Sequence, residues 1–218
     1  MSSAIDLPRL RQICTAALAS DCLDALGFTK QVLGSDITMI SGDGVAIGFA
    51  FPVRLKIVDA FPEVPYIGLL KALDAVGADQ IYITPTGRTG LAALWGELLA
   101  TACAFKGVVA ALTDGPVRDT IRMRAMGFKV FGVGTNPIDI NGRYEVIEHN
   151  VACEIDGVTI NPGDLIIADV DGVVVVPQSQ ITEVVRRVEE KNSGENQFRK
   201  AVKEGMSPSV AFATYGVL

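Results

Sequence analysis

The segment between residues 78 and 134 constrains the fold most strongly, because strand-like and helix-like stretches alternate along it. Three stretches have the length and composition of buried strands: IYITPTG, VVAALTDG and KVFGVG. Two helical stretches that each end in glycine separate them: GELLATACAFKG and RDTIRMRAMG. This alternation indicates parallel strands joined by crossover helices. The sequence therefore predicts an α/β fold.

The flanking regions add further helices and antiparallel strands. Apolar residues recur at helical spacing over residues 8–27, where a second helical turn is expected to begin near Ser20 and to end at Gly27. Residues 65–76 are also predicted to be helical. Residues 154–177 contain short apolar runs broken by DG and NPGD turns, a pattern typical of hairpins. A polar helix, ITEVVRRVEEKN, and a charged tail segment follow. We expect one domain over residues 1–218 that mixes parallel β/α units with antiparallel β-strands.

Composition limits the classes of function. Of the 218 residues, 49% are hydrophobic and 20% are charged, as in an ordinary globular protein, and the net charge of -6 argues against a nucleic-acid binder. The N-terminus lacks the long apolar region of a signal peptide. The longest apolar runs, such as GVVVVP, are too short to span a membrane. We expect a cytoplasmic protein without nucleic-acid or membrane partners.

The cysteines and the single histidine suggest no catalytic or metal site of their own. Cys14, Cys22, Cys103 and Cys153 are widely scattered and form no CxxC motif, which favours buried free thiols over structural zinc. His149 is the only histidine and lies in a polar segment, YEVIEHN. A Ser-His-Asp or Cys-His mechanism would depend wholly on it, so we do not expect one.

The first candidate site is the start of the helix that contains Gly96, Glu97, Leu98 and Leu99. The first amides of a helix have no partner within the helix, and the helix dipole there favours negative charge. A glycine lets a ligand approach the backbone closely. This start could hold a carboxylate or phosphate, or it could be a plain helix N-terminus with glycine as its cap.

The second candidate site follows the strand that ends at Asp114. Ligands bind at the carboxyl ends of strands in α/β units, and the strand ends near Gly87 and Asp114 would be neighbours if their strands pair. Arg118 could bind a carboxylate through two parallel hydrogen bonds, and Asp119 is a suitable oxygen ligand for Mg²⁺. The alternative is an aspartate at a helix start beside a solvated arginine.

The order of these motifs resembles a known family. From about Leu23 to Gly205 the chain contains GELLATA, a strand ending in DGPVRD, then FKVFGVG and NPGDLIIADVDGVVVVP, as in the RraA-like family. Its catalytic members are class II pyruvate aldolases, including 4-hydroxy-4-methyl-2-oxoglutarate aldolase. Some members have been mislabelled as demethylmenaquinone methyltransferases, but no glycine-rich strand–turn–helix for methyl transfer opens this chain.

The resemblance implies roles for individual residues. The amides of Gly96 to Leu99 would hold the pyruvate carboxylate, and Arg118 would bind the substrate. Asp119 would be the direct ligand of Mg²⁺, Mn²⁺ or another divalent cation. Glu97 and Asp114 would hold the waters around the metal. The activity implied is a lyase that releases pyruvate from a 2-oxo acid by retro-aldol cleavage or by decarboxylation, as of oxaloacetate.

The resemblance also implies a fold and an assembly. The family fold is a swivelling β/β/α sandwich with mixed parallel and antiparallel strands, usually assembled as a homotrimer or homohexamer. Glu195, in GENQFRKAVKEG, resembles a catalytic acidic residue that reaches the site of a neighbouring subunit. One position departs from the aldolases, which have an acidic residue where this chain has Arg122. At three residues beyond Asp119 on a helix, Arg122 could compete with the metal or bind a second anionic group of the substrate.

Two other readings remain as alternatives. A Schiff-base aldolase would need a lysine in an apolar site, whereas Lys56 is expected to share a solvated strand face with Arg54. A non-catalytic RraA-type regulator would inhibit a ribonuclease through protein contacts, and the acidic composition also fits that role. Such an inhibitor has no need of the combination of Gly96, Arg118 and Asp119, which therefore favours the enzyme.

Overall fold

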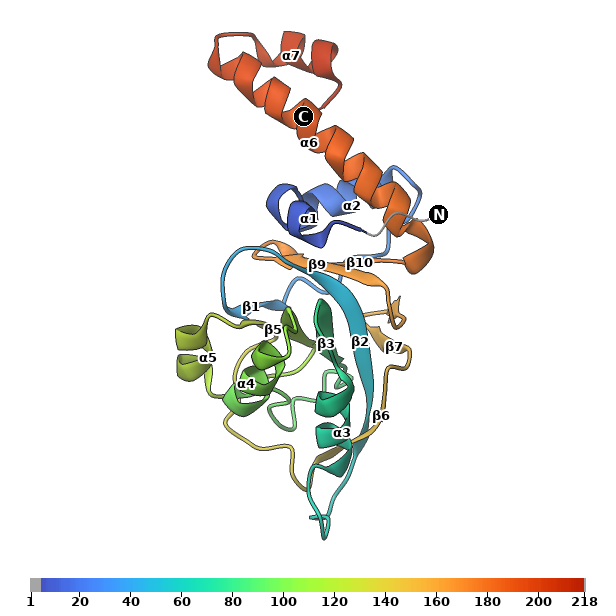
Figure 1. The fold of residues 1–218 in the computed structure, drawn as a ribbon, viewed down its shortest axis with the longest axis vertical. Coiled ribbons are helices and arrows are strands. Elements are labelled where there is room, and N and C mark those ends of the chain that lie inside the picture. Colours follow the sequence, from blue (N-terminus) through green and yellow to red (C-terminus); the bar gives the residue numbers. More distant parts are fainter. Residues whose placement is uncertain (1–4, 218) are drawn as a thin grey trace.

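The centre of the protein is a curled sheet of eight strands, described over residues 5–217 in a computed structural model. The helices that contact this sheet pack against one face of it, and the side chains of the other face pack against one another and against residues 153–160. Helices α3 (Ile67–Ala75), α4 (Glu97–Phe105) and α5 (Thr120–Met126) lie on one side of the sheet. Helices α1 (Leu7–Ile13) and α2 (Ala16–Asp24) pack near β9 and β10 together with the start of α6 (Figure 1).

The predicted parallel strands form the middle of this sheet. They are β3 (Gln80–Thr84), β4 (Ala110–Thr113) and β5 (Lys129–Gly132), which pair in this order and in parallel. The longer strand β2 (Ala46–Ile57) pairs with β3, also in parallel, and was not part of the predicted series. Helices α3, α4 and α5 connect them, as the alternation along the chain predicts. Thr84 pairs with Thr113, so the carboxyl ends of β3 and β4 are neighbours. The prediction of an α/β fold with a parallel centre is confirmed.

Antiparallel strands extend the sheet on both sides. Strand β1 (Thr38–Ser41) pairs with β5, while β9 (Leu165–Asp169) pairs with β2 and with β10 (Gly172–Val176). Strand β6 (Tyr144–His149) pairs with the second half of β2, and β7 (Cys153–Ile155) forms a separate hairpin with β8 (Val158–Ile160). The predicted hairpins over residues 154–177 are therefore present. Strands β1 and β6 were not expected, because their pairing partners are distant in sequence.

The helical region expected over residues 8–27 consists of two helices, and the second begins after Thr15 rather than near Ser20 as predicted. Cys14 is extended, and the side chain of Thr15 accepts a hydrogen bond from the amide of Leu18. The carboxylate of Asp169 also accepts one from the amide of Ala16 at 2.8 Å. Helix α2 thus has a start of its own, fixed by a capping threonine and by a contact with a distant strand.

The C-terminal region is more helical than expected. After the short 3₁₀ turn η1 (Gln178–Gln180), helix α6 (Ile181–Lys203) runs for 23 residues through what the sequence suggested was a charged tail segment. Helix α7 (Pro208–Tyr215) packs back on its end, and Figure 1 shows both projecting from the rest of the protein. Over residues 5–217 no helix has the length and apolar character needed to cross a membrane.

Candidate active site

A cavity of about 430 Å³ lies where α3, α4 and the start of α5 approach one another. One part of its lining is polar and the other is almost wholly aliphatic. The polar lining residues are Tyr66, Arg118, Asp119 and Asp139, next to the backbone of Gly96. Leucines of α3 and α4 form most of the apolar part: Leu69, Leu70, Leu73, Leu98 and Leu99. The cavity therefore combines a charged end with a hydrophobic wall.

The start of α4 is built around a glycine that has no room for a side chain. Gly96 is the N-cap residue, and a Cβ there would lie 2.7 Å from Oδ2 of Asp119 and 3.2 Å from Cγ of Arg118. Any other residue would displace these two side chains. The first amides of α4, which follow Gly96, have no carbonyl partner within the helix. One of them, from Glu97, donates to Oδ2 of Asp119 at 3.3 Å.

Backbone pairing beyond the ends of the strands holds Arg118 in place. Val117 forms parallel bridges with Trp95 on one side and with Thr135 on the other, and the Arg118 amide donates to the Trp95 carbonyl at 2.8 Å. The guanidinium Nη2 of Arg118 donates to Oδ2 of Asp139 at 3.3 Å. Its Nε lies 3.8 Å from Oδ2 of Asp119. The structure thus brings Gly96, Arg118 and Asp119 together, as the family resemblance implied.

Asp119 has an unusual backbone and a carboxylate that does not serve its own helix. It is the N-cap residue of α5 with a left-handed φ of 58°, and its side chain makes no capping hydrogen bond. An N-cap aspartate ordinarily accepts a hydrogen bond from the following amides. Here the carboxylate faces the start of α4 instead, and its side chain is 46% exposed. Residues held in sparsely populated conformations cluster at functional sites.

The carboxylate of Asp119 could serve as the one protein ligand of a hydrated divalent cation. Over the described residues 5–217, no group of three or more His, Cys, Asp or Glu side chains is arranged to hold a metal ion. Mg²⁺ does not require such a cage, since it usually binds one or two carboxylates and keeps several waters. The half-exposed carboxylate of Asp119 provides one such ligand next to a cavity that has room for substrate and water.

Glu97 and Arg122 interact with each other on the side facing α5. Oε1 of Glu97 accepts a hydrogen bond from Thr101 at 3.0 Å, and Oε2 lies 3.8 Å from Nη1 of Arg122. Neither side chain lines the cavity, and that of Arg122 is 79% exposed. The ion pair that Arg122 makes is therefore with Glu97 rather than with Asp119.

Asp114 and Glu195 lie outside this cavity. Asp114 is buried, and its two carboxylate oxygens accept hydrogen bonds from the backbone amides of Thr86 and Arg88. Glu195 is on α6, 3.6 Å from Nη2 of Arg199 and far from α4 of the same chain (Figure 1). Glu195 could act on a site of this kind only in a neighbouring subunit.

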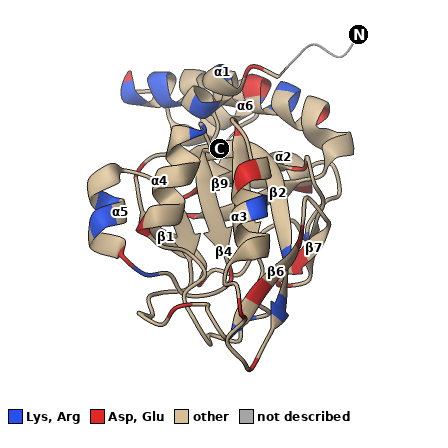
Figure 2. Ribbon diagram, turned by 60° about the horizontal axis from the view of Figure 1, so that its bottom comes forward, with Lys and Arg blue, Asp and Glu red and all other residues tan. Residues whose placement is uncertain are grey.

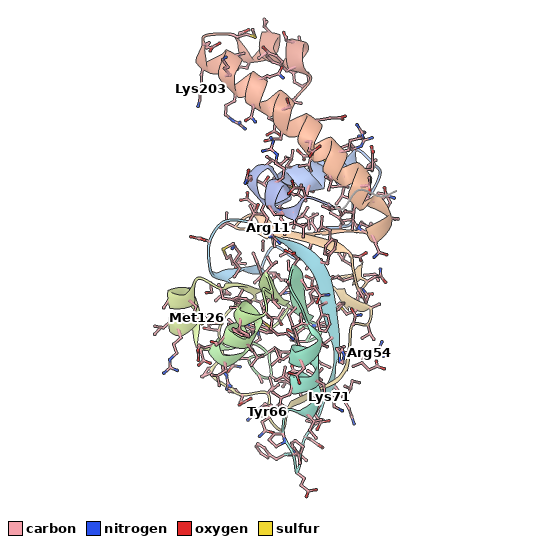
Figure 3. The ribbon with its side chains drawn as sticks, in the orientation of Figure 1. Arg11, Arg54, Tyr66, Lys71, Met126 and Lys203 are labelled. Carbon is pink, nitrogen blue, oxygen red and sulfur yellow. The ribbon has the colours of Figure 1, made fainter. Side chains whose placement is uncertain are left out.

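Tyr66 and Asp139 were not found by sequence reasoning. Tyr66, at the start of α3 (Figure 3), donates its hydroxyl to Oδ2 of Asp139 at 2.9 Å. Burial alone would raise the pKa of Asp139, but the hydrogen bonds from Tyr66 and from a backbone amide, with the nearby guanidinium, lower it below its usual value. The same carboxylate oxygen holds Arg118, so Asp139 orients the guanidinium in the cavity.

The residues of the rival chemistries lie elsewhere. Lys56 is exposed on β2, with Arg54 on the same face paired to Glu148. The ring of His149 stacks on Phe51 with centroids 5.9 Å apart, and neither it nor Lys56 lines the cavity. The four cysteines are free thiols, and burial raises the pKa of Cys14, Cys103 and Cys153 to about 12. The prediction of free thiols is confirmed, with Cys153 only half-buried.

Comparison with known proteins identifies the family. The model of the RraA-like family, described as Aldolase/RraA, matches residues 15–175. The chain belongs to this family. A protein of Halalkalibacterium halodurans named "Putative 4-hydroxy-4-methyl-2-oxoglutarate aldolase" is 28% identical over 201 residues, covering 92% of this chain and 90% of that protein. Protein DlpA of Legionella pneumophila is 29% identical over 208 residues, covering 93% of this chain and 32% of DlpA, so the chain spans about a third of that relative.

A solved structure shows the same fold. RraAS2 of Streptomyces coelicolor, described as an unusual member of the RNase ES inhibitor RraA protein family, has a TM-score of 0.76 at 24% identity. The match covers 91% of this chain and 99% of RraAS2. The predicted swivelling β/β/α sandwich is thereby confirmed, and at this identity the likeness shows the fold alone.

Proposed function

We propose that this RraA-like protein is a divalent-metal-dependent carbon–carbon lyase that releases pyruvate from a 2-oxo acid. The strongest support is the arrangement of Arg118, Asp119 and the first amides of α4 along one wall of a cavity of about 430 Å³. The aldolase name of the Halalkalibacterium halodurans relative agrees with this reaction class. An inhibitor that acts through its outer surface would need neither the cavity nor the strained Asp119.

In this proposal the charged end of the cavity binds the pyruvyl part of the substrate. The guanidinium of Arg118, already oriented by Asp139, binds the carboxylate through charge-assisted hydrogen bonds. The amides at the start of α4 add donors and a favourable helix dipole. Asp119 would hold the cation beside the 2-oxo group, where the cation would act as a Lewis acid.

Retro-aldol cleavage then requires one proton acceptor. The bond between C3 and C4 breaks, its electron pair moves to C3 of the departing pyruvate enolate, and the proton of the C4 hydroxyl passes to a base. C3 later takes up a proton to give pyruvate. The described part of the chain places no histidine or lysine side chain in the cavity lining, so we assign the base to a carboxylate or to water. Glu195 of a neighbouring subunit in a homotrimer or homohexamer is our candidate.

The test is a screen of 4-hydroxy-2-oxo acids and oxaloacetate with Mg²⁺ or Mn²⁺, in which released pyruvate is measured. We expect turnover that excess EDTA abolishes and that added metal restores, because one protein carboxylate gives modest metal affinity. Full turnover in excess EDTA, or no pyruvate from any of these acids with metal, would overturn the proposal. Sedimentation of the active species tests the assembly, since an active monomer would contradict the role of Glu195.

A further inference from the structure

The aliphatic wall of the cavity faces the space where the rest of the substrate would lie. Helix α3 contributes three leucines to the lining, and α4 contributes two leucines and an alanine: Leu69, Leu70, Leu73, Leu98, Leu99 and Ala102. The only charged residue of α4 is Glu97, which faces α5, and Figure 2 shows α4 almost entirely tan beside the blue segments of α5. This wall offers no cation to a second anionic group.

The size of the cavity indicates that it is shaped for more than pyruvate. Pyruvate has few heavy atoms, whereas about 430 Å³ would hold roughly fourteen waters at ~30 Å³ each. Ligand sites of this size are usually lined by apolar side chains with a few polar groups that fix orientation. The apolar part of this lining is continuous with the charged end, so one ligand can contact both.

The charges in the lining balance for a substrate with a single carboxylate. Arg118 contributes one positive charge, and Asp119 and Asp139 contribute two negative charges. Within one chain, a divalent cation changes the total from minus one to plus one, and one substrate carboxylate neutralises it. Glu195 of a neighbouring subunit, our candidate for the base, would add a negative charge and so disfavour a second substrate carboxylate further. A second carboxylate would restore a net negative charge among leucines, where desolvation of an unpaired ion is costly. Arg122 does not line the cavity and already faces Glu97.

We propose that the part of the substrate beyond the cleaved bond is apolar and uncharged, so that the substrate is a monocarboxylic 4-hydroxy-2-oxo acid with an aliphatic group at C4. This inference rests on the proposed function for the placement of the pyruvyl part. In this inference the leucines of α3 and α4 contact the substituent on C4 of the substrate and so determine which substrates bind.

Binding of two unreactive analogues tests the proposal without turnover. In 5-methyl-2-oxohexanoate an isopropyl group replaces the second carboxylate of 2-oxoglutarate, so the two acids have nearly the same shape. With the full chain and Mg²⁺ in titration calorimetry, we expect the isopropyl analogue to bind roughly tenfold or more tightly than 2-oxoglutarate. Equal binding, or tighter binding of 2-oxoglutarate, overturns the inference. If pyruvate binds in the same experiment, the proposed function still stands, whereas no binding of pyruvate overturns both.

A charge placed in the wall should reverse this preference. Leu70 lines the cavity but is 55% exposed, so Leu70→Lys should fold, and its ammonium should favour 2-oxoglutarate over the isopropyl analogue. The control is Leu91→Lys, which adds the same charge at a position that is 44% exposed and outside the lining. It should leave both dissociation constants unchanged. An unaltered preference in Leu70→Lys, or an equal shift in both variants, would show that the leucine wall does not contact this group.

Discussion

Two aspartates that follow strand β4 have opposite environments. Asp114 is buried, and both its carboxylate oxygens accept hydrogen bonds from backbone amides of the loop after β3. Asp119, on the next loop segment, is half-exposed, has a left-handed backbone and accepts one hydrogen bond, from Glu97 at 3.3 Å. The first carboxylate joins two loops, whereas the second has oxygen lone pairs available for a ligand.

The arginines of the two regions differ in the same way. Arg88 lies between Asp36 and Asp156, and the hydrogen bonds that its guanidinium donates to Asp156 and to Asp36 raise its pKa above the usual value. Arg118 contacts the carboxylate of Asp139 at 3.3 Å and also lines the cavity. Arg88 and Asp114 have their hydrogen-bonding groups occupied by other parts of the chain and support the fold. Over the described residues 5–217, Arg118 and Asp119 have groups left free in the cavity, where we propose that the substrate binds.

Substitution of Asp119 should have the largest effect on activity and so best tests the contrast between Asp119 and Asp114. Asp119→Asn keeps the shape and tolerates a positive φ, so the folded state should be preserved. Loss of the metal ligand should lower the rate of pyruvate release by about a thousandfold, or roughly 4 kcal/mol in activation free energy. Steady-state kinetics at saturating Mg²⁺ measure this change.

A matched control exists on the surface. Asp79 also has a positive φ, of 59°, and pairs with an arginine, Arg11, at 2.7 Å. Asp79→Asn should leave pyruvate release unchanged. If the rate of pyruvate release by Asp119→Asn stayed within tenfold of the unmodified protein, Asp119 would support the fold, as Asp114 does, and would not hold the metal.

The second effect concerns the two arginines. Arg118→Lys keeps the charge but loses the planar fork, so pyruvate binding should weaken by about 1.5–3 kcal/mol, or roughly 10- to 150-fold. Arg88→Lys, the corresponding change in the other region, should alter the unfolding midpoint and not the dissociation constant. Titration of both variants with pyruvate in the presence of Mg²⁺ gives the two dissociation constants. If Arg88→Lys weakens pyruvate binding as much as Arg118→Lys does, the proposed contrast between the two arginines is wrong.

The third predicted effect is a loss of stability when Asp114 is substituted. In Asp114→Asn an amide NH₂ replaces one carboxylate oxygen and faces a backbone donor of Thr86 or Arg88. The free energy of unfolding should fall by about 1–3 kcal/mol, the cost of a buried donor left without an acceptor. The dissociation constant for pyruvate should stay the same. Denaturant unfolding measures the first quantity, and unchanged stability with lost binding would place Asp114 in the active site after all.

Local sequence patterns were sufficient for the regular elements of this fold. Strands β3, β4 and β5 and their connecting helices follow from alternating apolar runs and glycine ends. The break between α1 and α2 was misplaced because part of its cause is tertiary, the hydrogen bond that the amide of Ala16 donates to the carboxylate of Asp169. The continuation of α6 beyond ITEVVRRVEEKN was missed because the residues that follow, several of them charged and one of them Gly194, form a weaker helical pattern. In the folded chain the side chain of Val217 packs against Gly194, a contact that no local pattern predicts.

For the candidate site, the resemblance implied that Gly96, Arg118 and Asp119 lie together, and the structure brings them together, but the resemblance did not give their surroundings. Tyr66 and Asp139 are separated by 73 residues, and neither belongs to a motif that predicts their hydrogen bond. Asp114 is part of the same DGPVRD motif as Asp119, and only the backbone amides of a neighbouring loop distinguish the two. Patterns locate the ends of strands, whereas the hydrogen-bond partners there depend on the assembled fold.

The smallest effect on binding and stability is expected at Arg122, which is on α5 but does not line the cavity. Its side chain is 79% exposed and lies 3.8 Å from Glu97, so its removal should change stability by no more than about 0.5 kcal/mol. Arg122→Glu removes the positive partner of Glu97 and adds a negative charge at the start of α5. Metal binding should therefore tighten by roughly two- to fivefold, an effect that salt should weaken.

Arg124→Glu is the control for this charge reversal, because Arg124 is on the same helix but donates to the carbonyl of Ile40 at 3.0 Å. A direct effect near Glu97 should appear in Arg122→Glu and not in Arg124→Glu, whereas a general effect of net charge should appear in both. If Arg122 bound a second carboxylate of the substrate, its reversal would instead raise the KM for dicarboxylic substrates and leave metal affinity unchanged. The position of Arg122 outside the cavity lining favours the first result. Measuring the metal Kd and the KM of both variants distinguishes these outcomes.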